Sequence, residues 1–169
     1  MNIQSALTEG LNILKNKSIL SAKLDSEILM AKALGKKREY IILNNDKIIK
    51  EQNLEYFKKL VQERVTGKPI AYLLKKKSFW NSEFYVDNNT LIPRPDTEII
   101  LEQILKFTKN KNYLKILDIG VGSGCILLSV LNERKNFHGT GIDISKNALD
   151  TCKINAKKLL LDRRVKFFK

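Results

Sequence analysis

The stretch from Lys115 to Asp143 constrains the fold of this chain more than any other. Its apolar residues Ile116, Leu117 and Ile119 predict a short strand buried on both faces. Three glycines at alternate positions follow, where the backbone can turn sharply and approach a ligand closely. A helix is expected over 126–131 and a second strand over 138–142. This order of strand, glycine turn, helix and strand predicts a parallel α/β unit.

The glycine turn and the acid beyond it predict a binding site. The first free N–H groups and the positive dipole end of the following helix face the turn, which suits an anionic group such as a carboxylate. Asp143 lies about twenty residues beyond the turn, where a ribose-binding carboxylate falls in nucleotide-binding βαβ units. The candidate cofactor-binding residues are Gly120, Val121, Gly122, Ser123, Gly124 and Asp143.

The spacing of the glycines separates two nucleotide classes. A dinucleotide site favours glycine at position 125, but Cys125 stands there. The pattern Asp118-x-Gly-x-Gly-x-Gly instead favours S-adenosylmethionine as the cofactor. An alternative is that the glycines only permit close packing and that Asp143 caps the next helix.

Length and composition describe an ordinary globular chain. With 169 residues, 43% hydrophobic and 29% charged, we expect one or two domains. No apolar run approaches the roughly 18 residues that cross a membrane, and no signal peptide begins the chain. Cys125 and Cys152 lack metal-like spacing, so we expect no metal site and two reduced thiols in a cytoplasmic protein.

The formal net charge of +13 leaves two interpretations open. The charge would attract nucleic acid, a ribosome or an acidic protein partner. Lys, Asn and Ile are all abundant, however, and all three have AT-rich codons. We therefore favour a lysine-rich solvated surface produced by genomic composition, with no requirement for direct nucleic-acid binding.

The pattern over residues 1–69 predicts a small bundle of four helices that acts as a substrate-recognition domain. The second helix should bury Leu24, Ile28, Ala31 and Leu34 and stop at Gly35. Asn45 or Asp46 should cap the fourth helix.

Residues 70–92 predict a β-hairpin connector, in which Trp80 fills the joint between domains or stacks on a ligand. The remaining residues, 93–169, hold the α/β unit. Two prolines stiffen the segment around Arg94, which makes this cation a candidate site residue, and Asp96 should cap the following helix. We expect a third strand over 165–168. His138, at a strand start, should lie on the surface.

The chain resembles the release factor glutamine methyltransferases, also called the HemK/PrmC family. Segments that carry the resemblance are 24–35 in the second helix, 64–74 before the hairpin, Leu91-Ile-Pro-Arg-Pro-Asp-Thr-Glu98, the glycine turn and 141–149. One departure is Lys75, where the family has glycine. Nucleic-acid base-amine methyltransferases share the glycine turn, but segment 93–98 and the helical domain match the release-factor enzymes.

The resemblance implies a fold and an activity. The fold is a helical domain, a hairpin connector and a Rossmann-like class I methyltransferase sheet, of which the first three strands are present. The activity is transfer of a methyl group from S-adenosylmethionine to the glutamine side-chain amide of the Gly-Gly-Gln motif in peptide chain release factors. In this relationship residues 120–124 border the methionine part of the cofactor and Asp143 accepts hydrogen bonds from the ribose.

The Asn-Pro-Pro-Tyr motif that holds the target glutamine in the family is absent, since the prolines are Pro69, Pro93 and Pro95. We therefore assign no catalytic residue and expect the 169-residue chain alone to be inactive. We interpret the chain as a truncated or split gene product, whose strand 115–119 has an unpaired edge open to another chain. Another function consistent with the sequence is a non-catalytic module that binds cofactor or release factor.

Overall fold

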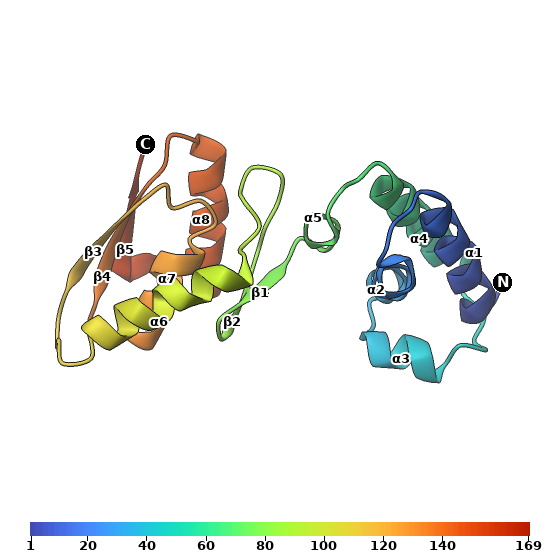
Figure 1. Cartoon of the computed structure of the whole chain (residues 1–169), viewed down its shortest axis with the longest axis horizontal. Helices are drawn as coiled ribbons and strands as arrows, with labels where there is room; N and C mark the ends of the chain where they lie inside the picture. The colour runs from blue at the N-terminus through green and yellow to red at the C-terminus, as the bar shows by residue number, and fades with distance from the viewer. The chain divides into compact units, whose positions relative to one another are not determined.

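The computed structural model describes residues 1–169 and divides the chain into two compact units, 1–74 and 75–169 (Figure 1). None of the helices combines the length and the apolar character that crossing a membrane demands.

The first unit is helical. Its elements are α1 (Ile3–Asn16), α2 (Ala22–Leu34), α3 (Arg38–Leu43), α4 (Glu51–Val65) and α5 (Ile70–Leu74). Asn2 begins α1, because its side chain accepts a hydrogen bond from the N–H of Ser5 at 2.8 Å. Gly35 ends α2 in the left-handed conformation with φ 61°, as predicted. Residues 70–74, placed in the connector from sequence, form a helix in this unit.

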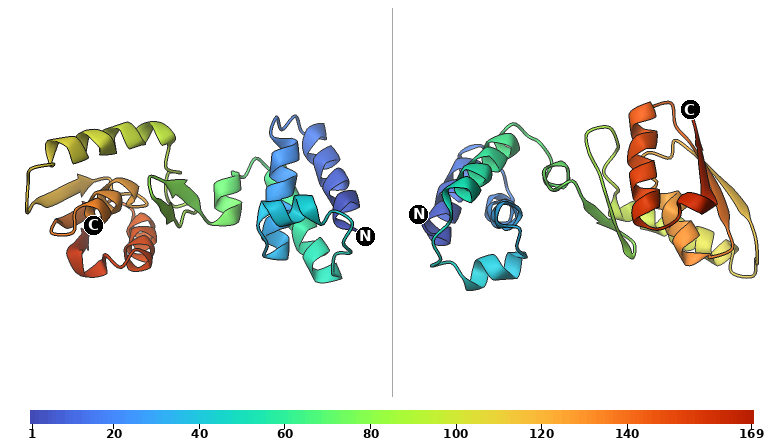
Figure 2. Two further views of the ribbon diagram at one scale, coloured as in Figure 1. Left: turned by 90° about the horizontal axis from the view of Figure 1, so that it is seen from below. Right: turned by 180° about the vertical axis from the view of Figure 1, so that it is seen from behind.

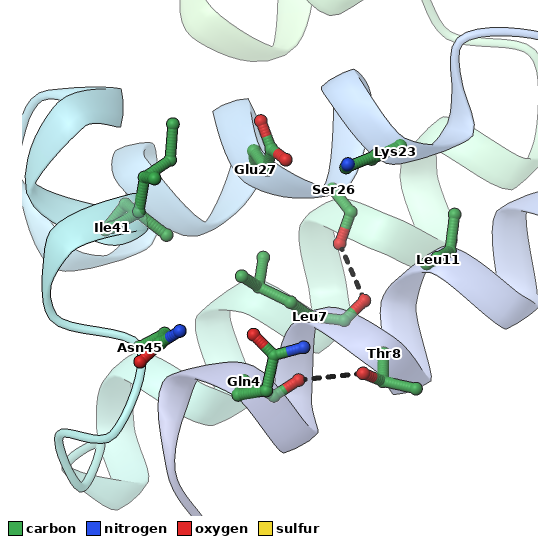
Figure 3. A pocket seen from close by; sticks show the side chains of 10 residues that line it. Gln4, Leu7, Thr8, Leu11, Lys23, Ser26, Glu27, Ile41 and Asn45 are labelled. Atoms are coloured by element: carbon green, nitrogen blue, oxygen red, sulfur yellow. Dashed lines mark hydrogen bonds between the residues drawn. The ribbon is translucent and has the colours of Figure 1, made fainter.

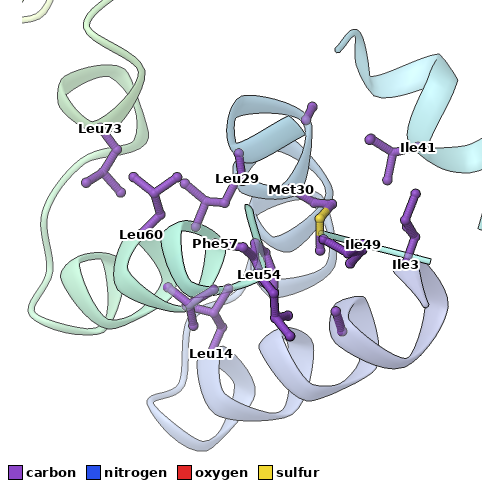
Figure 4. Packing of buried hydrophobic residues seen from close by; sticks show 14 of the residues in the cluster. Ile3, Leu14, Leu29, Met30, Ile41, Ile49, Leu54, Phe57, Leu60 and Leu73 are labelled. Atoms are coloured by element: carbon purple, nitrogen blue, oxygen red, sulfur yellow. The ribbon is translucent and has the colours of Figure 1, made fainter. Parts of the chain in front are cut away.

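The core of this unit is formed mainly by large hydrophobic side chains of α1, α2 and α4, which pack against one another (Figure 4). Leu14, Leu29, Met30 and Phe57 are almost completely buried. The predicted inner face of α2 is only partly right: Ala31 is buried and Leu34 packs against the core, but Leu24 is exposed while Asp25 and Glu27 are buried.

Two ion pairs explain how acidic side chains of α2 come to be buried. The Asp25 carboxylate accepts a hydrogen bond from Nε of Arg64 at 2.8 Å. The Glu27 carboxylate accepts one from Nε of Arg38 at 2.7 Å. Buried carboxylates are tolerated where a cation pairs with them.

The predicted cap of α4 is also wrong. Lys50, with no side-chain bond, precedes the helix in place of Asn45 or Asp46. The segment before it is held by the N-terminus, since Asn2 and Ile48 form an antiparallel bridge and the N–H of Ile49 donates to the Met1 carbonyl at 3.0 Å. The contacts of Ile48 and Ile49 with the N-terminus therefore determine where the segment before α4 ends and the helix begins.

The second unit is α/β. It contains a hairpin of β1 (Lys77–Phe79) and β2 (Ser82–Phe84), the 3-10 turn η1 (Pro95–Thr97), α6 (Glu98–Phe107), β3 (Lys115–Ile119), α7 (Cys125–Glu133), β4 (His138–Ile142), α8 (Lys146–Lys158), the 3-10 turn η2 (Asp162–Arg164) and β5 (Val165–Phe168). The three long strands are parallel in the order β3-β4-β5. Asp96 lies inside η1 and does not cap α6, because the α-helix begins at Glu98, one residue later than predicted, and Thr97 precedes it.

All three helices lie on one side of this sheet (Figures 1 and 2). α7 packs on β3 and β4, α8 packs on β5, and α6 packs on α7. A Cβ at Gly139 would meet Leu127 and Leu131 of α7 at 2.9 and 3.0 Å, so that glycine of β4 lets the helix approach the strands.

The opposite side is an open face. By strand alternation it carries Lys115, Leu117, Ile119, His138, Thr140, Ile142, Lys166 and Phe168. Leu117 is 56% exposed and Ile119 78% exposed, so the prediction that this strand is buried on both faces is wrong. β3 also has one strand neighbour instead of two, so it is an edge strand with unpaired backbone groups.

Candidate cofactor site at the glycine turn

The glycine turn joins the end of β3 to the start of α7. Gly120, Gly122 and Gly124 have φ of 82°, 54° and 82°, which side chains other than glycine rarely adopt. The N–H groups of Gly120 and Val121 both donate to the Ile142 carbonyl, at 2.8 and 3.0 Å. The turn is therefore fastened to the carboxyl end of β4, beside the acid predicted to bind ribose.

The three glycines do different things. A Cβ at Gly120 would meet nothing within 4 Å, and one at Gly122 would meet only the Gly120 carbonyl, at 3.9 Å. A Cβ at Gly124 would lie 2.5 Å from Sγ of Cys152 and 2.8 Å from Leu128. Gly120 and Gly122 thus leave open space for a ligand, whereas Gly124 serves the packing of α7 against α8.

Asp143 is bonded directly to the turn. Its Oδ2 accepts a hydrogen bond from the N–H of Gly122 at 2.9 Å, and its Oδ1 accepts one from the N–H of Ser145 at 2.9 Å. The cap of α8 is Ser145, whose hydroxyl accepts from the N–H of Ala148 at 3.2 Å. The structure therefore assigns the cap to Ser145, and the half-buried Asp143 carboxylate retains lone pairs for further donors.

A second carboxylate lies beneath the turn. Asp118 accepts a hydrogen bond from the N–H of Leu127 in the first turn of α7. Burial raises the pKa of Asp118 above its ordinary value, the bond from Leu127 opposes that rise, and the nearby Asp143 charge adds to it. A role for the Asp118 carboxylate was not predicted, although its place at the end of β3, two residues before Gly120, was the signal.

Asn155 is a structural residue of the site that was not predicted. This completely buried side chain on α8 accepts from the N–H of Tyr85 at 2.6 Å and donates to the carbonyls of Tyr85 and Ser123 at 2.9 and 2.8 Å. It therefore ties the glycine turn to the segment that follows the hairpin. A signal was present in principle, because Asn155 interrupts the apolar spacing of Cys152 and Ala156 on the predicted helix.

Burial also affects the two cysteines beside the turn. It raises the pKa of Cys125, and it raises that of Cys152 to about 12. Both thiols are therefore protonated at neutral pH and act as small apolar groups. Ile144, directly after Asp143, is 90% exposed and offers an apolar surface next to the carboxylate.

The remaining candidates from sequence lie elsewhere in the second unit. The backbone N–H of Trp80 donates to Glu98 at 2.8 Å and its indole Nε1 donates to Glu133 at 2.7 Å. Trp80 packs against the core of its own unit and helps hold the hairpin to α6 and α7. The side chain of Arg94 is exposed and makes no hydrogen bond or ion pair.

The first unit has a cavity of its own, of about 250 Å³ (Figure 3). Leu7, Leu11 and Ile41 form its apolar part. The hydroxyls of Thr8 and Ser26 lie at its wall but already donate to backbone carbonyls, at 3.0 and 3.1 Å. The cavity therefore combines apolar surface with the side-chain polar groups of Gln4, Lys23 and Asn45, and these residues form no catalytic arrangement.

Two family models match the chain. Residues 5–74 match the PrmC N-terminal domain, and residues 110–169 match a methyltransferase domain. Together they cover the helical unit and the sheet with its glycine turn.

Curated relatives match the chain across both units. A release factor glutamine methyltransferase of Leptospira interrogans is 39% identical and aligns with 94% of this chain and 56% of its own length. That of Clostridium botulinum is 38% identical over 100% of this chain and 60% of its own length. A bifunctional methyltransferase of Rickettsia bellii is 34% identical over 93% of this chain and 33% of its own length. The chain thus spans a little over half the length of the release factor glutamine methyltransferases it matches.

Among solved structures, a SAM-dependent methyltransferase from Geobacter sulfurreducens in complex with S-adenosyl-L-homocysteine aligns with a TM-score of 0.38. The two chains are 28% identical, and the alignment covers 44% of this chain and 28% of the other.

Proposed function

We propose that this chain, which is 38% identical over its whole length to a release factor glutamine methyltransferase, belongs to an S-adenosylmethionine-dependent methyltransferase. The proposed reaction is transfer of a methyl group to the glutamine side-chain amide of a peptide chain release factor. The helical unit contributes contacts to the protein substrate, and the glycine turn contributes the cofactor site.

One observation carries the cofactor assignment. Open space lies beside Gly120 and Gly122, and the Asp143 carboxylate is fixed to that same turn by the Gly122 N–H at 2.9 Å. Residues 120–124 would border the amino-acid part of the cofactor. Asp143 would accept hydrogen bonds from the ribose hydroxyls through the lone pairs that its two backbone bonds leave free. The exposed Ile144 would contact the adenine ring.

In the proposed reaction the cofactor and the protein have different roles. The bound cofactor supplies an electrophilic methyl group on a sulfonium. An amide nitrogen is a poor nucleophile because its lone pair is delocalised into the carbonyl, so acceptors must hold the amide hydrogens and orient the nitrogen. Within residues 1–169 we assign those acceptors to no side chain, because the family's Asn-Pro-Pro-Tyr motif is not among them. This chain's own contribution is binding and positioning.

The cavity of the helical unit supports a role in substrate recognition. Its wall is mostly apolar, and Lys23 and Glu27 place one charge of each sign beside it. Glu27 is paired with Arg38, so Lys23 is the charged group that remains to meet an acidic residue on the substrate. We infer that this cavity accepts an apolar side chain of the release factor.

A second candidate is binding without turnover. The glycine turn and Asp143 would hold the cofactor in this case as well, and this candidate predicts affinity for the cofactor with no methyl transfer.

Two measurements test these functions. Calorimetric titration of the 169-residue chain with S-adenosylhomocysteine tests the cofactor site, and absence of binding heat and of thermal stabilisation would contradict it. Incubation with a release factor and methyl-labelled S-adenosylmethionine then separates the candidates. Label on the Gly-Gly-Gln glutamine supports catalysis, whereas cofactor binding with no label supports the binding module.

A further inference from the structure

A second cavity, of about 300 Å³, lies at the opposite edge of the parallel sheet from the glycine turn. Lys115, His138 and Val165, the first residues of β3, β4 and β5, all line it. The glycine turn follows the last residue of β3. The cavity is therefore separate from the proposed cofactor site by the length of the strands.

The charges around this cavity are of one sign. Lys115, Arg163 and Lys166 line it, and no acidic side chain does. All three are exposed, and none of them forms an ion pair. Gathering unpaired cations around one hollow raises their mutual repulsion, which a bound anion would relieve.

Arg164, which also lines the cavity, has a different task. Its guanidinium donates to four backbone carbonyls, among them those of Leu131 at 2.8 Å and Lys135 at 2.8 Å. These bonds fix η2 against the end of α7. The neighbouring Arg163 lies on the turn that these bonds hold in place, and its exposed guanidinium lines the cavity.

The cavity also has an aromatic wall. The Tyr113 ring is 54% exposed, and its centroid lies 5.6 Å from that of His138 at an interplanar angle of 50°. The hydroxyl of Thr140 adds a neutral hydrogen-bond donor on the open face. Cations that track phosphates, combined with aromatic rings on which bases stack, are the elements of single-strand nucleic-acid sites.

We propose that this cavity binds the phosphate group of a nucleotide, free or within a single-stranded nucleic acid, with its base against Tyr113. Lysine and arginine both form strong charge-assisted bonds to phosphate oxygens. The net positive charge of the second unit also favours an anionic ligand, since residues 75–169 contain 18 Lys and Arg and 10 Asp and Glu. An acidic peptide would satisfy the cations but would leave the exposed aromatic ring without a planar partner.

The test is fluorescence anisotropy of a labelled ten-nucleotide oligouridine RNA titrated with the whole chain at several salt concentrations. The pocket variant Lys115→Ser/Arg163→Ser is compared with Lys17→Ser/Lys59→Ser, which removes the same charge from exposed, unpaired lysines of the first unit. We expect the pocket variant to bind about tenfold more weakly or worse and to lose about 1.4 units of salt slope, about 0.7 for each of the two phosphate contacts. Equal weakening by both double variants, or no change in the pocket variant, would overturn the proposal.

Competition identifies the source of the phosphate. If adenosine monophosphate displaces the RNA with an affinity similar to that of the RNA itself, the ligand is a free nucleotide. If it displaces the RNA much more weakly, the ligand is a single-stranded nucleic acid. Tyr113→Leu should weaken both nucleotide ligands but leave the weak competition by inorganic phosphate unchanged, and an equal effect on all three would refute the base contact. If the double variant fails to fold, Lys166→Ser alone, an exposed side chain, should still weaken RNA binding. S-adenosylhomocysteine affinity should stay unchanged in every pocket variant, so this proposal and the cofactor assignment fail separately.

Discussion

Asn155 on α8 donates a hydrogen bond from its side-chain amide to the carbonyl of Ser123 in the glycine turn, at 2.8 Å. The same amide group exchanges two further bonds with the backbone of Tyr85. One buried side chain thus fixes the turn to a segment far away in sequence. The stability of the second unit and the shape of the candidate site are therefore coupled.

Asn155→Ala should lower the free energy of unfolding of the second unit by about 3 kcal/mol, because it leaves buried N–H and C=O groups without partners. Trp80 is the only tryptophan of the chain and belongs to this unit, so its fluorescence during urea unfolding reports the change. Asn147→Ala is the control, since Asn147 is exposed on the same helix and makes one long bond of 3.3 Å to Asn89. An equal midpoint for both variants would contradict the coupling.

Asp143→Ala should weaken S-adenosylhomocysteine binding by about 1–3 kcal/mol, the scale of a lost charged acceptor. Asp143→Asn keeps one acceptor oxygen and should lose less affinity than alanine. Calorimetric titration measures both variants, with Asp150→Ala as the control because Asp150 is an exposed carboxylate on α8. Affinity unchanged by alanine at 143 would remove this carboxylate from the site.

Gly120→Ala should weaken cofactor binding more than it weakens folding. Its φ of 82° costs an alanine about 1 kcal/mol, and the new methyl group would occupy the space that a ligand needs. Gly35→Ala is a matched control, because Gly35 also has positive φ and open surroundings but lies in the first unit. The thermal shifts of the two variants should be similar, while only Gly120→Ala reduces affinity. If Gly35→Ala lowered the cofactor affinity as much as Gly120→Ala, the effect would be a general one of the substitution, and the prediction for Gly120 would be wrong.

The raised pKa of Asp118 predicts a dependence of stability on pH. A carboxyl whose folded pKa lies above its unfolded value binds its proton more tightly when folded. Its contribution to stability therefore falls as the pH rises from near 3.8, the ordinary value, and the fall ends above the raised pKa. Asp118→Asn should remove this component and unfold at a higher temperature than wild type at pH 7. Melting curves from pH 4 to 8 measure the difference, and parallel curves for wild type and Asp118→Asn would exclude it.

The edge of β3 should drive self-association of the isolated chain. Leu117 and Ile119 are exposed beside unpaired backbone groups, a combination that invites strand pairing. Sedimentation equilibrium should show association that rises with concentration, and Ile119→Lys should reduce it. Ile154→Lys, on an exposed apolar position of α8, should not. A wild-type chain that stays monomeric at all concentrations would disprove this role of the edge.

The sequence by itself determined the local structure of this protein. Glycines at 120, 122 and 124 fixed the turn because only glycine adopts its backbone angles without strain, and apolar spacing fixed α1, α7, α8 and the three parallel strands. The position of Asp143 at a strand end was likewise visible, since the carboxyl ends of parallel strands meet at one edge.

Only the tertiary structure decided which side chains meet across long separations. Arg64 and Arg38 let Asp25 and Glu27 be buried in the helical unit, whereas Leu24, which was expected inside, is exposed. Asn155 joined two distant backbone segments. The exposure of β3 depends on which strands and helices pack beside it, and the local sequence pattern of a strand does not specify those neighbours.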